Sequence, residues 1–180
     1  MHNRVNPAVS IRSSAPVSAR SWIRGSLTVL VLFALAATAS LPRKPAASRL
    51  DEVAHLSYVA HAQVTGPKWP GFAEMRMIDP ETFQFGAEQN YLNHPPFYYW
   101  LIAAFGPQLL GRPESVIPAR ALNIALATFG LAALLLLARC MQLGQGEFYA
   151  FAAMVASTPA LAALAGSVNN DNLAFFGGAV

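Results

Sequence analysis

The chain has 180 residues, of which 54% are hydrophobic, and it carries only 12 basic and 9 acidic side chains. An ordinary soluble domain has more charges and fewer apolar residues, so the composition predicts an integral membrane protein. The net charge of +3 comes from scattered basic residues, which argues against nucleic-acid binding, and the single cysteine excludes an internal disulfide.

Residues 1–20 are rich in Ser, Pro, Ala and Arg and have no apolar periodicity, which predicts a disordered N-terminus. Residues 22–41 form the first predicted membrane span. Arginines but no acidic residues precede this span, so the positive-inside tendency predicts a cytoplasmic N-terminus. A cleaved signal peptide ending at Ala37-Thr38-Ala39 is the alternative, but the spans that follow favour a retained helix.

A long outer loop is predicted for residues 43–118, with two interfacial helices inside it. The first helix covers residues 49–64, and Ser48 with Asp51 forms a capping signature at its start. The second covers residues 97–111, which follow a Pro-Pro pair and are too few to cross a bilayer. The segment between them has turn residues and no steady period, which predicts a loop.

The uncharged runs 121–138 and 148–168 predict the second and third spans, with Pro159 as a kink inside the third. A fourth span begins at residues 172–180 and is truncated. The expected fold is therefore an all-α, polytopic transmembrane protein with three full spans and part of a fourth. Residues 21–180 would form the N-terminal part of a larger membrane domain.

This count of spans brings Asp51 and Asp171 to the same outer face of the membrane. A fully spanning helix at 97–111 would put the two acids on opposite faces instead. The short length of that segment argues against this alternative.

Asp51, Glu52 and His55 form the first candidate site. Positions 51 and 55 share one face of a helix, and an acid pair with a histidine beside lipid is costly unless it binds or reacts with something. One carboxylate could deprotonate an acceptor hydroxyl while the other orients it or binds a divalent cation. His55 could bind a metal ion, relay a proton or contact a phosphate group. Helix capping is the structural alternative for the acids.

Three further positions complete the set of candidates. His94, next to Asn93, precedes a helix whose free N–H groups would attract a phosphate, although a simple turn also explains the segment. Asn170 and Asp171 open the fourth span, either as a cap or as part of a site. Arg120, with Asn123, lies at the head of the second span and could bind a lipid phosphate, although an arginine that extends its charge to the interface is the favoured explanation.

The order of these motifs resembles that of bacterial membrane proteins in the GT-C glycosyltransferase superfamily. A first span is followed by an Asp-Glu pair with a nearby His, then by His-Pro-Pro-Phe-Tyr-Tyr, and after the third span by Asn-Asn-Asp-Asn-Leu. Over residues 20–180 the pattern is similar to an uncharacterised family of predicted membrane proteins. That family is related to the protein O-mannosyltransferases and the lipid A aminoarabinose transferases.

The resemblance implies an enzyme of the bacterial inner membrane that moves a sugar from a polyprenyl-phosphate carrier to an envelope or protein acceptor. Asp51 or Glu52 would be the base or orient the acceptor, His94 would meet the carrier phosphate, and Asp171 would shape the site. A divalent ion, Mg²⁺ or Mn²⁺, held by Glu52 and Asp171 is the candidate cofactor, and Asn93 stands where some relatives have an acid. The alternatives are a non-enzymatic transporter or envelope-assembly subunit, and a lipid-phosphate-binding protein with an inactive site.

Overall fold

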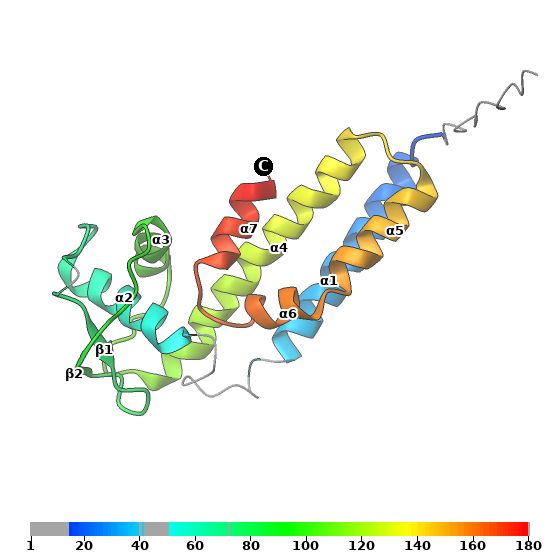
Figure 1. Cartoon of the computed structure of the whole chain (residues 1–180). Helices are drawn as coiled ribbons and strands as arrows, with labels where there is room; N and C mark the ends of the chain where they lie inside the picture. The colour runs from blue at the N-terminus through cyan, green and yellow to red at the C-terminus, as the bar shows by residue number, and fades with distance from the viewer. Residues whose placement is uncertain (1–14, 40, 42–50, 72, 180) are drawn as a thin grey trace, which may run out of the picture.

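The computed structural model describes residues 15–39, 41, 51–71 and 73–179. A bundle of helices carries a small lobe at one end (Figure 1). The bundle contains α1 (Ala19–Ala39), α4 (Val116–Cys140), α5 (Gln145–Ala156), α6 (Pro159–Ala165) and α7 (Asp171–Ala179). The lobe contains α2 (Glu52–Thr65), β1 (Arg76–Ile78), β2 (Phe85–Gln89) and α3 (Phe97–Phe105), and a 3₁₀ turn at Pro113–Ser115 leads into α4.

Among the described residues, α1 and the continuous helix Pro113–Cys140 are long and apolar enough to cross a membrane. Both helices expose large apolar side chains, as lipid-facing surfaces do: Ile23, Leu27, Val31, Leu32 and Leu35 on α1, and Phe129, Leu136 and Leu137 on α4. Phe33 and Ala37 of α1 pack instead into a core that contains Leu131 and Leu135 of α4. This packing makes α1 part of the bundle and favours a retained helix over a cleaved signal peptide.

The predicted third span is broken into two helices. α5 and α6 meet at an angle of 55°, and by length and composition the pair is either one bent span or a re-entrant loop. Pro159 has no N–H with which to continue the hydrogen bonding of α5, and it begins α6 instead. The break falls at Pro159, where the sequence predicts a kink, but the prediction of three full spans is not confirmed.

α7 packs alongside α4 (Figure 1). Like α4, it begins at the end of the bundle that carries the lobe. The lobe also lies where α1 ends and α4 begins, so Asp51 and Asp171 are at the same end of the molecule. Asp51 and Asp171 would lie on opposite faces of a membrane if α3 crossed it, but α3 has only nine residues. About 20 residues are needed to cross a bilayer as a helix.

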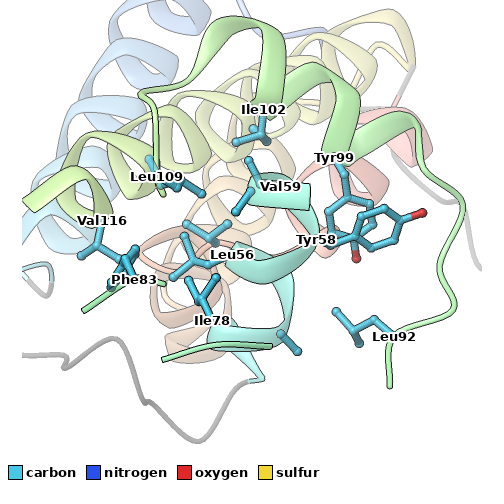
Figure 2. Close-up of a cluster of buried hydrophobic side chains, with 14 of the residues drawn as sticks. Leu56, Tyr58, Val59, Ile78, Phe83, Leu92, Tyr99, Ile102, Leu109 and Val116 are labelled. Carbon is cyan, nitrogen blue, oxygen red and sulfur yellow. The ribbon is translucent and has the colours of Figure 1, made fainter. Parts of the chain in front are cut away.

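A hydrophobic core built around α2 fills the lobe and extends to Ala119 of α4 and to Val168 (Figure 2). Residues 54–60 of α2 are all buried, because α3 and β1 both pack against this helix. The core residues include Leu56, Val59, Ile78, Phe83, Ile102 and Leu109. α2 is therefore enclosed by protein, in contrast to the interfacial helix that was predicted.

A β-hairpin is the clearest departure from the predicted all-α fold, since β1 and β2 pair antiparallel in the segment expected to be a loop. The Asp79 carboxylate stabilises the connection by accepting a hydrogen bond from the Thr82 N–H at 2.8 Å. The Ser57 hydroxyl of α2 accepts another from the Ile78 N–H at 2.8 Å. An isolated hairpin this short is marginal in water, so its packing on α2 stabilises it.

The lobe helices differ from the predicted boundaries for local reasons. α2 begins at Glu52, with Asp51 as N-cap at a φ of 53° and without a side-chain capping bond. Ser48, the predicted capping partner, lies outside the described residues. α3 ends at Phe105 and not at residue 111, because Pro107 cannot continue helical hydrogen bonding.

Part of the N-terminal segment predicted to be disordered is ordered. The Val17 N–H donates to the Leu143 carbonyl at 3.0 Å, and the Arg139 guanidinium donates to the Val17 carbonyl at 3.1 Å. The connection between α4 and α5 thus holds the chain that leads into α1. The disorder prediction is wrong for residues 15–20, and residues 1–14 lie outside the described part of the chain.

Candidate functional site

Asp51 and Glu52 point in different directions at the start of α2. Asp51 is exposed and has a left-handed backbone conformation, whereas Glu52, the first helical residue, is fully buried. Successive helical residues point about 100° apart, because a turn contains 3.6 residues. The two acids are therefore neighbours in sequence but do not form a pair in space.

Glu52 forms an ion pair with Arg120 of α4. Nε of Arg120 donates to Oε1 at 2.8 Å, and Nη2 donates to Oε2 at 2.5 Å. Nη1 of Arg120 also donates to the Leu41 carbonyl at 3.1 Å, and the Val168 N–H donates to Glu52 Oε1 at 2.8 Å. The pair thus fastens the lobe to the chain after α1, to α4 and to the segment before α7.

This geometry favours a structural role for Glu52 and Arg120 over the roles predicted from sequence. Both carboxylate oxygens of Glu52 accept hydrogen bonds from inside the protein, so a metal ion would have to displace Arg120. Arg120 faces this carboxylate and is buried, away from any lipid phosphate. Buried charges of opposite sign require such pairing.

Asp51 is an exposed carboxylate held by one strong contact. Its Oδ1 accepts a hydrogen bond from the Tyr91 hydroxyl at 2.6 Å. This bond, followed by partial burial, raises the pKa of Tyr91 to about 12, so Tyr91 remains a donor at neutral pH. Asp51 combines a fixed position with access to solvent, as a group that accepts a proton from a substrate requires.

His55 lies one turn after Asp51 and is buried. Its Nδ1 is hydrogen bonded to the Tyr99 hydroxyl at 2.9 Å, and its ring stacks on that of His94 with centroids 5.8 Å apart. Burial, followed by repulsion from His94, lowers the pKa of His55 to about 4, although the charge of Asp51 acts in the opposite direction. His55 is therefore neutral at pH 7, which suits a hydrogen-bonding group better than a cation for phosphate.

His94 is half-buried, and its neighbour Asn93 is exposed. The His94 carbonyl accepts a long hydrogen bond, 3.4 Å, from the Tyr58 hydroxyl. Tyr58 in turn stacks on Tyr99 with ring centroids 3.7 Å apart (Figure 2). This aromatic stack holds the His94 segment against α2 and keeps its imidazole beside that of His55.

Asp171 is exposed at the start of α7. Burial is the main cause that raises the pKa of Tyr99, and the charges of Tyr58 and Asp171 add to it. Asp171 thus contributes to the electrostatic environment of Tyr99. Asn170 is half-buried, and its carbonyl accepts the Ala174 N–H at 3.0 Å as α7 begins.

A buried network of amides and one tyrosine, which sequence reasoning missed, joins α3, α4 and α7. The Asn123 Oδ1 accepts hydrogen bonds from the Tyr98 hydroxyl at 2.8 Å and from the Asn172 amide at 3.0 Å. The Asn169 amide donates to the Leu164 carbonyl at 2.9 Å. The available signal was Asn123 itself, because an amide inside an apolar run needs a partner.

The predicted metal site does not fit the donors that the fold provides. No group of three or more His, Cys, Asp or Glu side chains in the described part of the chain could hold a metal ion. Of the two predicted ligands, Glu52 is bound to Arg120, and Asp171 is exposed at the start of α7. Mg²⁺ and Ca²⁺ prefer several oxygen ligands around one position, which these residues do not supply.

An apolar cavity of about 170 Å³ lies beside Asp171. Its other lining residues come from α1, α4, α6 and α7: Phe33, Ala127, Leu161, Leu164, Asn172 and Phe175. A carboxylate at the edge of an apolar cavity suits a ligand with a polar part and a hydrocarbon part.

The chain matches no protein-family model, no curated protein and no solved structure. Its chemistry is therefore inferred from geometry. One exposed carboxylate, Asp51, lies near a neutral buried histidine, His55, and a half-buried histidine, His94. Such a set can accept a proton and donate a hydrogen bond to an anion.

Proposed function

We propose that the protein is a multi-pass glycosyltransferase of the bacterial inner membrane, with a cytoplasmic N-terminus. It would transfer a sugar from a polyprenyl-phosphate carrier to an envelope glycan, lipid or protein acceptor at the outer face. The observation that carries this proposal is the exposed Asp51 carboxylate near His55, whose ring stacks on that of His94. These residues lie at one end of a bundle whose longest helices suit a membrane.

The proposed reaction is a single displacement. Asp51 takes the proton of the acceptor hydroxyl while the hydroxyl oxygen attacks the anomeric carbon of the sugar. The bond between that carbon and the carrier phosphate breaks, polyprenyl phosphate leaves with the electron pair, and Asp51 later releases its proton to water. His94 donates a hydrogen bond to the phosphate, and neutral His55 fixes the His94 ring by stacking.

Two further features support this substrate class. The apolar cavity beside Asp171 offers space for part of a hydrocarbon chain, and the Asp171 carboxylate can accept hydrogen bonds from sugar hydroxyls. The Glu52–Arg120 ion pair holds the start of α2 against α4. In this proposal Glu52 and Arg120 are positioning residues that keep Asp51 in place.

Donor consumption by the full chain in proteoliposomes tests the proposal. Polyprenyl phosphates carrying radiolabelled hexoses, pentoses or amino sugars are supplied with membrane extract as acceptor, and release of polyprenyl phosphate is measured. We expect turnover of at least one donor, and we expect Asp51→Asn to slow it by about 10²- to 10⁴-fold, the usual contribution of a general base. Glu81→Gln, a matched change at an exposed acid of the hairpin connection, should leave the rate unchanged.

Two results would contradict the proposal. If the unaltered protein consumes none of the donors, the enzymatic function is wrong and the transporter or assembly alternative takes its place. If Asp51→Asn turns over as fast as the unaltered protein, Asp51 is not the base.

A further inference from the structure

α3 has an unusual distribution of polar atoms for a helix at a protein surface. Its buried face carries the hydroxyl groups of Tyr98 and Tyr99, which bond to Asn123 and His55 inside the protein. Its outward face contains no charged residue and leaves Phe97 exposed by 63%. The helix thus turns its hydroxyl groups inward and its hydrocarbon outward, the reverse of the arrangement that water favours.

The hydrogen bond between Tyr98 and Asn123 sets the depth at which α3 lies. Asn123 belongs to the uncharged run 121–138 of α4, which is one of the two helices able to cross a membrane in the described chain. The Asn172 amide of α7 bonds to the same Asn123 oxygen. α3 is therefore level with the first turns of the apolar part of α4 and with the start of α7 (Figure 1).

The end of α2 and the loop after it extend the apolar surface. Val64 is 60% exposed and Trp69 is 65% exposed. The Trp100 indole donates to the Lys68 carbonyl at 3.3 Å, which ties this loop to α3. At the end of α3, Phe105 is the most exposed of the large apolar residues, at 76%. We call the surface formed by Val64, Trp69, Phe97, Trp100 and Phe105 the aromatic edge.

The backbone at this edge has partners within the protein. After α3, the Gln63 side chain donates to the Pro107 carbonyl at 2.8 Å and accepts the Leu109 N–H at 3.1 Å. Such internal partners are required where water is scarce, because unpaired peptide groups are costly in the lipid region.

We infer that the aromatic edge docks the lobe onto the lipid bilayer, with its side chains in the interfacial layer. Aromatic side chains favour this layer, and the exposed Lys68 beside Trp69 can meet lipid phosphates. We favour the bilayer as the occupant because the bond between Tyr98 and Asn123 fixes α3 at the depth of an apolar run that is able to span a membrane. This inference does not depend on the proposed glycosyl transfer.

Spin labelling of the full chain in nanodiscs tests the docking. A nitroxide is attached at Phe105→Cys or, as a water-facing control, at Glu81→Cys, each with Cys140→Ser. Collisions with oxygen, which concentrates in lipid, and with a water-soluble nickel complex are measured by electron paramagnetic resonance. We expect the ratio of oxygen to nickel collisions to be several-fold higher at position 105 than at position 81.

A second label at Phe97→Cys tests whether the result at position 105 holds for the rest of the aromatic edge, and it should give a similarly high ratio of oxygen to nickel collisions. Thermal unfolding verifies that each labelled variant folds. A nickel-accessible label at both sites would show that the aromatic edge faces water, which overturns the inference. Labels shielded from both reagents would also overturn it, because a second copy of the chain or another protein would then cover the surface.

Discussion

The carboxylate of Glu52 and the guanidinium of Arg120 form an ion pair joined by two hydrogen bonds. The Glu52 side chain is 0% exposed and the Arg120 side chain is 1% exposed. Glu52 opens α2 in the lobe and Arg120 lies near the start of α4 in the bundle. Leu41 and Val168 bond to the same pair through their backbones. This buried electrostatic contact therefore helps to hold the lobe, and with it Asp51, against the bundle.

Removing one partner of this pair should destabilise the protein strongly. We expect Glu52→Gln to lower the free energy of unfolding by about 3–5 kcal/mol, because it leaves the Arg120 charge buried without a counter-charge. The double variant Glu52→Leu with Arg120→Met should be more stable than Glu52→Gln, since it removes both charges. Thermal unfolding in detergent measures these changes, with Glu81→Gln as the exposed control. A Glu52→Gln protein as stable as the unaltered one would contradict the buried pair.

The shared acceptor Asn123 should matter for the docking of α3 and α7. Asn123→Ala leaves the Tyr98 hydroxyl and the Asn172 amide without this acceptor, and an unsatisfied buried donor costs about 1–3 kcal/mol. Asn93→Ala is the matched change at an exposed asparagine, and it should stay within about 0.5 kcal/mol of the unaltered protein. Thermal unfolding compares the two. Equal stabilities of the two variants would rule out the network as a significant contact.

His55 should make stability depend on pH between its two pKa values. Burial lowers the pKa of folded His55 from 6.5 to about 4, with His94 adding to this and Asp51 opposing it. Between these pH values the unfolded chain binds a proton that the folded chain does not, so stability is lost as the pH falls from 6.5 toward 4. The loss should reach about 3 kcal/mol, at 1.36 kcal/mol per pKa unit.

Thermal unfolding of the unaltered protein and of His55→Asn from pH 4 to 7 measures this effect. The variant should have a flatter pH dependence, whatever its stability at pH 7. Parallel pH curves for the two proteins would show that His55 does not carry the effect.

Gly130 should be required for the close approach of α7 to α4. A Cβ at this position would lie 2.6 Å from the Phe175 ring and 3.1 Å from the Phe176 backbone. Gly130→Ala should therefore cost about 1–3 kcal/mol, as overpacking usually does. Gly177→Ala has no atom within 4 Å of the added carbon and should stabilise α7 by up to about 1 kcal/mol through helix propensity. The opposite order of unfolding temperatures would disprove the close packing.

The arrangement of the bundle predicts which residues share an aqueous face. In a Cys140→Ser background, Asp51→Cys and Asp171→Cys should react with a membrane-impermeant thiol reagent in intact spheroplasts. Gln142→Cys lies in the exposed connection between α4 and α5, at the other end of the bundle, and should react only after permeabilisation. Protection of position 171 while position 51 reacts would separate the two acids and remove the basis for a common site.

Several features follow from the sequence alone, because they depend on neighbours along the chain. The apolar runs around residues 22–41 and 121–138 predict membrane-spanning helices, and the structure has α1 and α4 there. The helix after the acid pair and the short helix after the Pro-Pro pair are likewise visible as local patterns. Asp51 is exposed and near His55, as expected from the spacing of one helical turn.

Only the tertiary structure decided the rest. The partner of Glu52 lies 68 residues away, and no local pattern distinguishes a carboxylate that meets Arg120 from one that meets a substrate. The burial of α2 and the pairing of β1 with β2 likewise arise from contacts between distant segments, which amphipathic periodicity does not report. Local patterns show where helices form and which residues are costly to bury, whereas the direction of a side chain and its partner are settled when the segments pack.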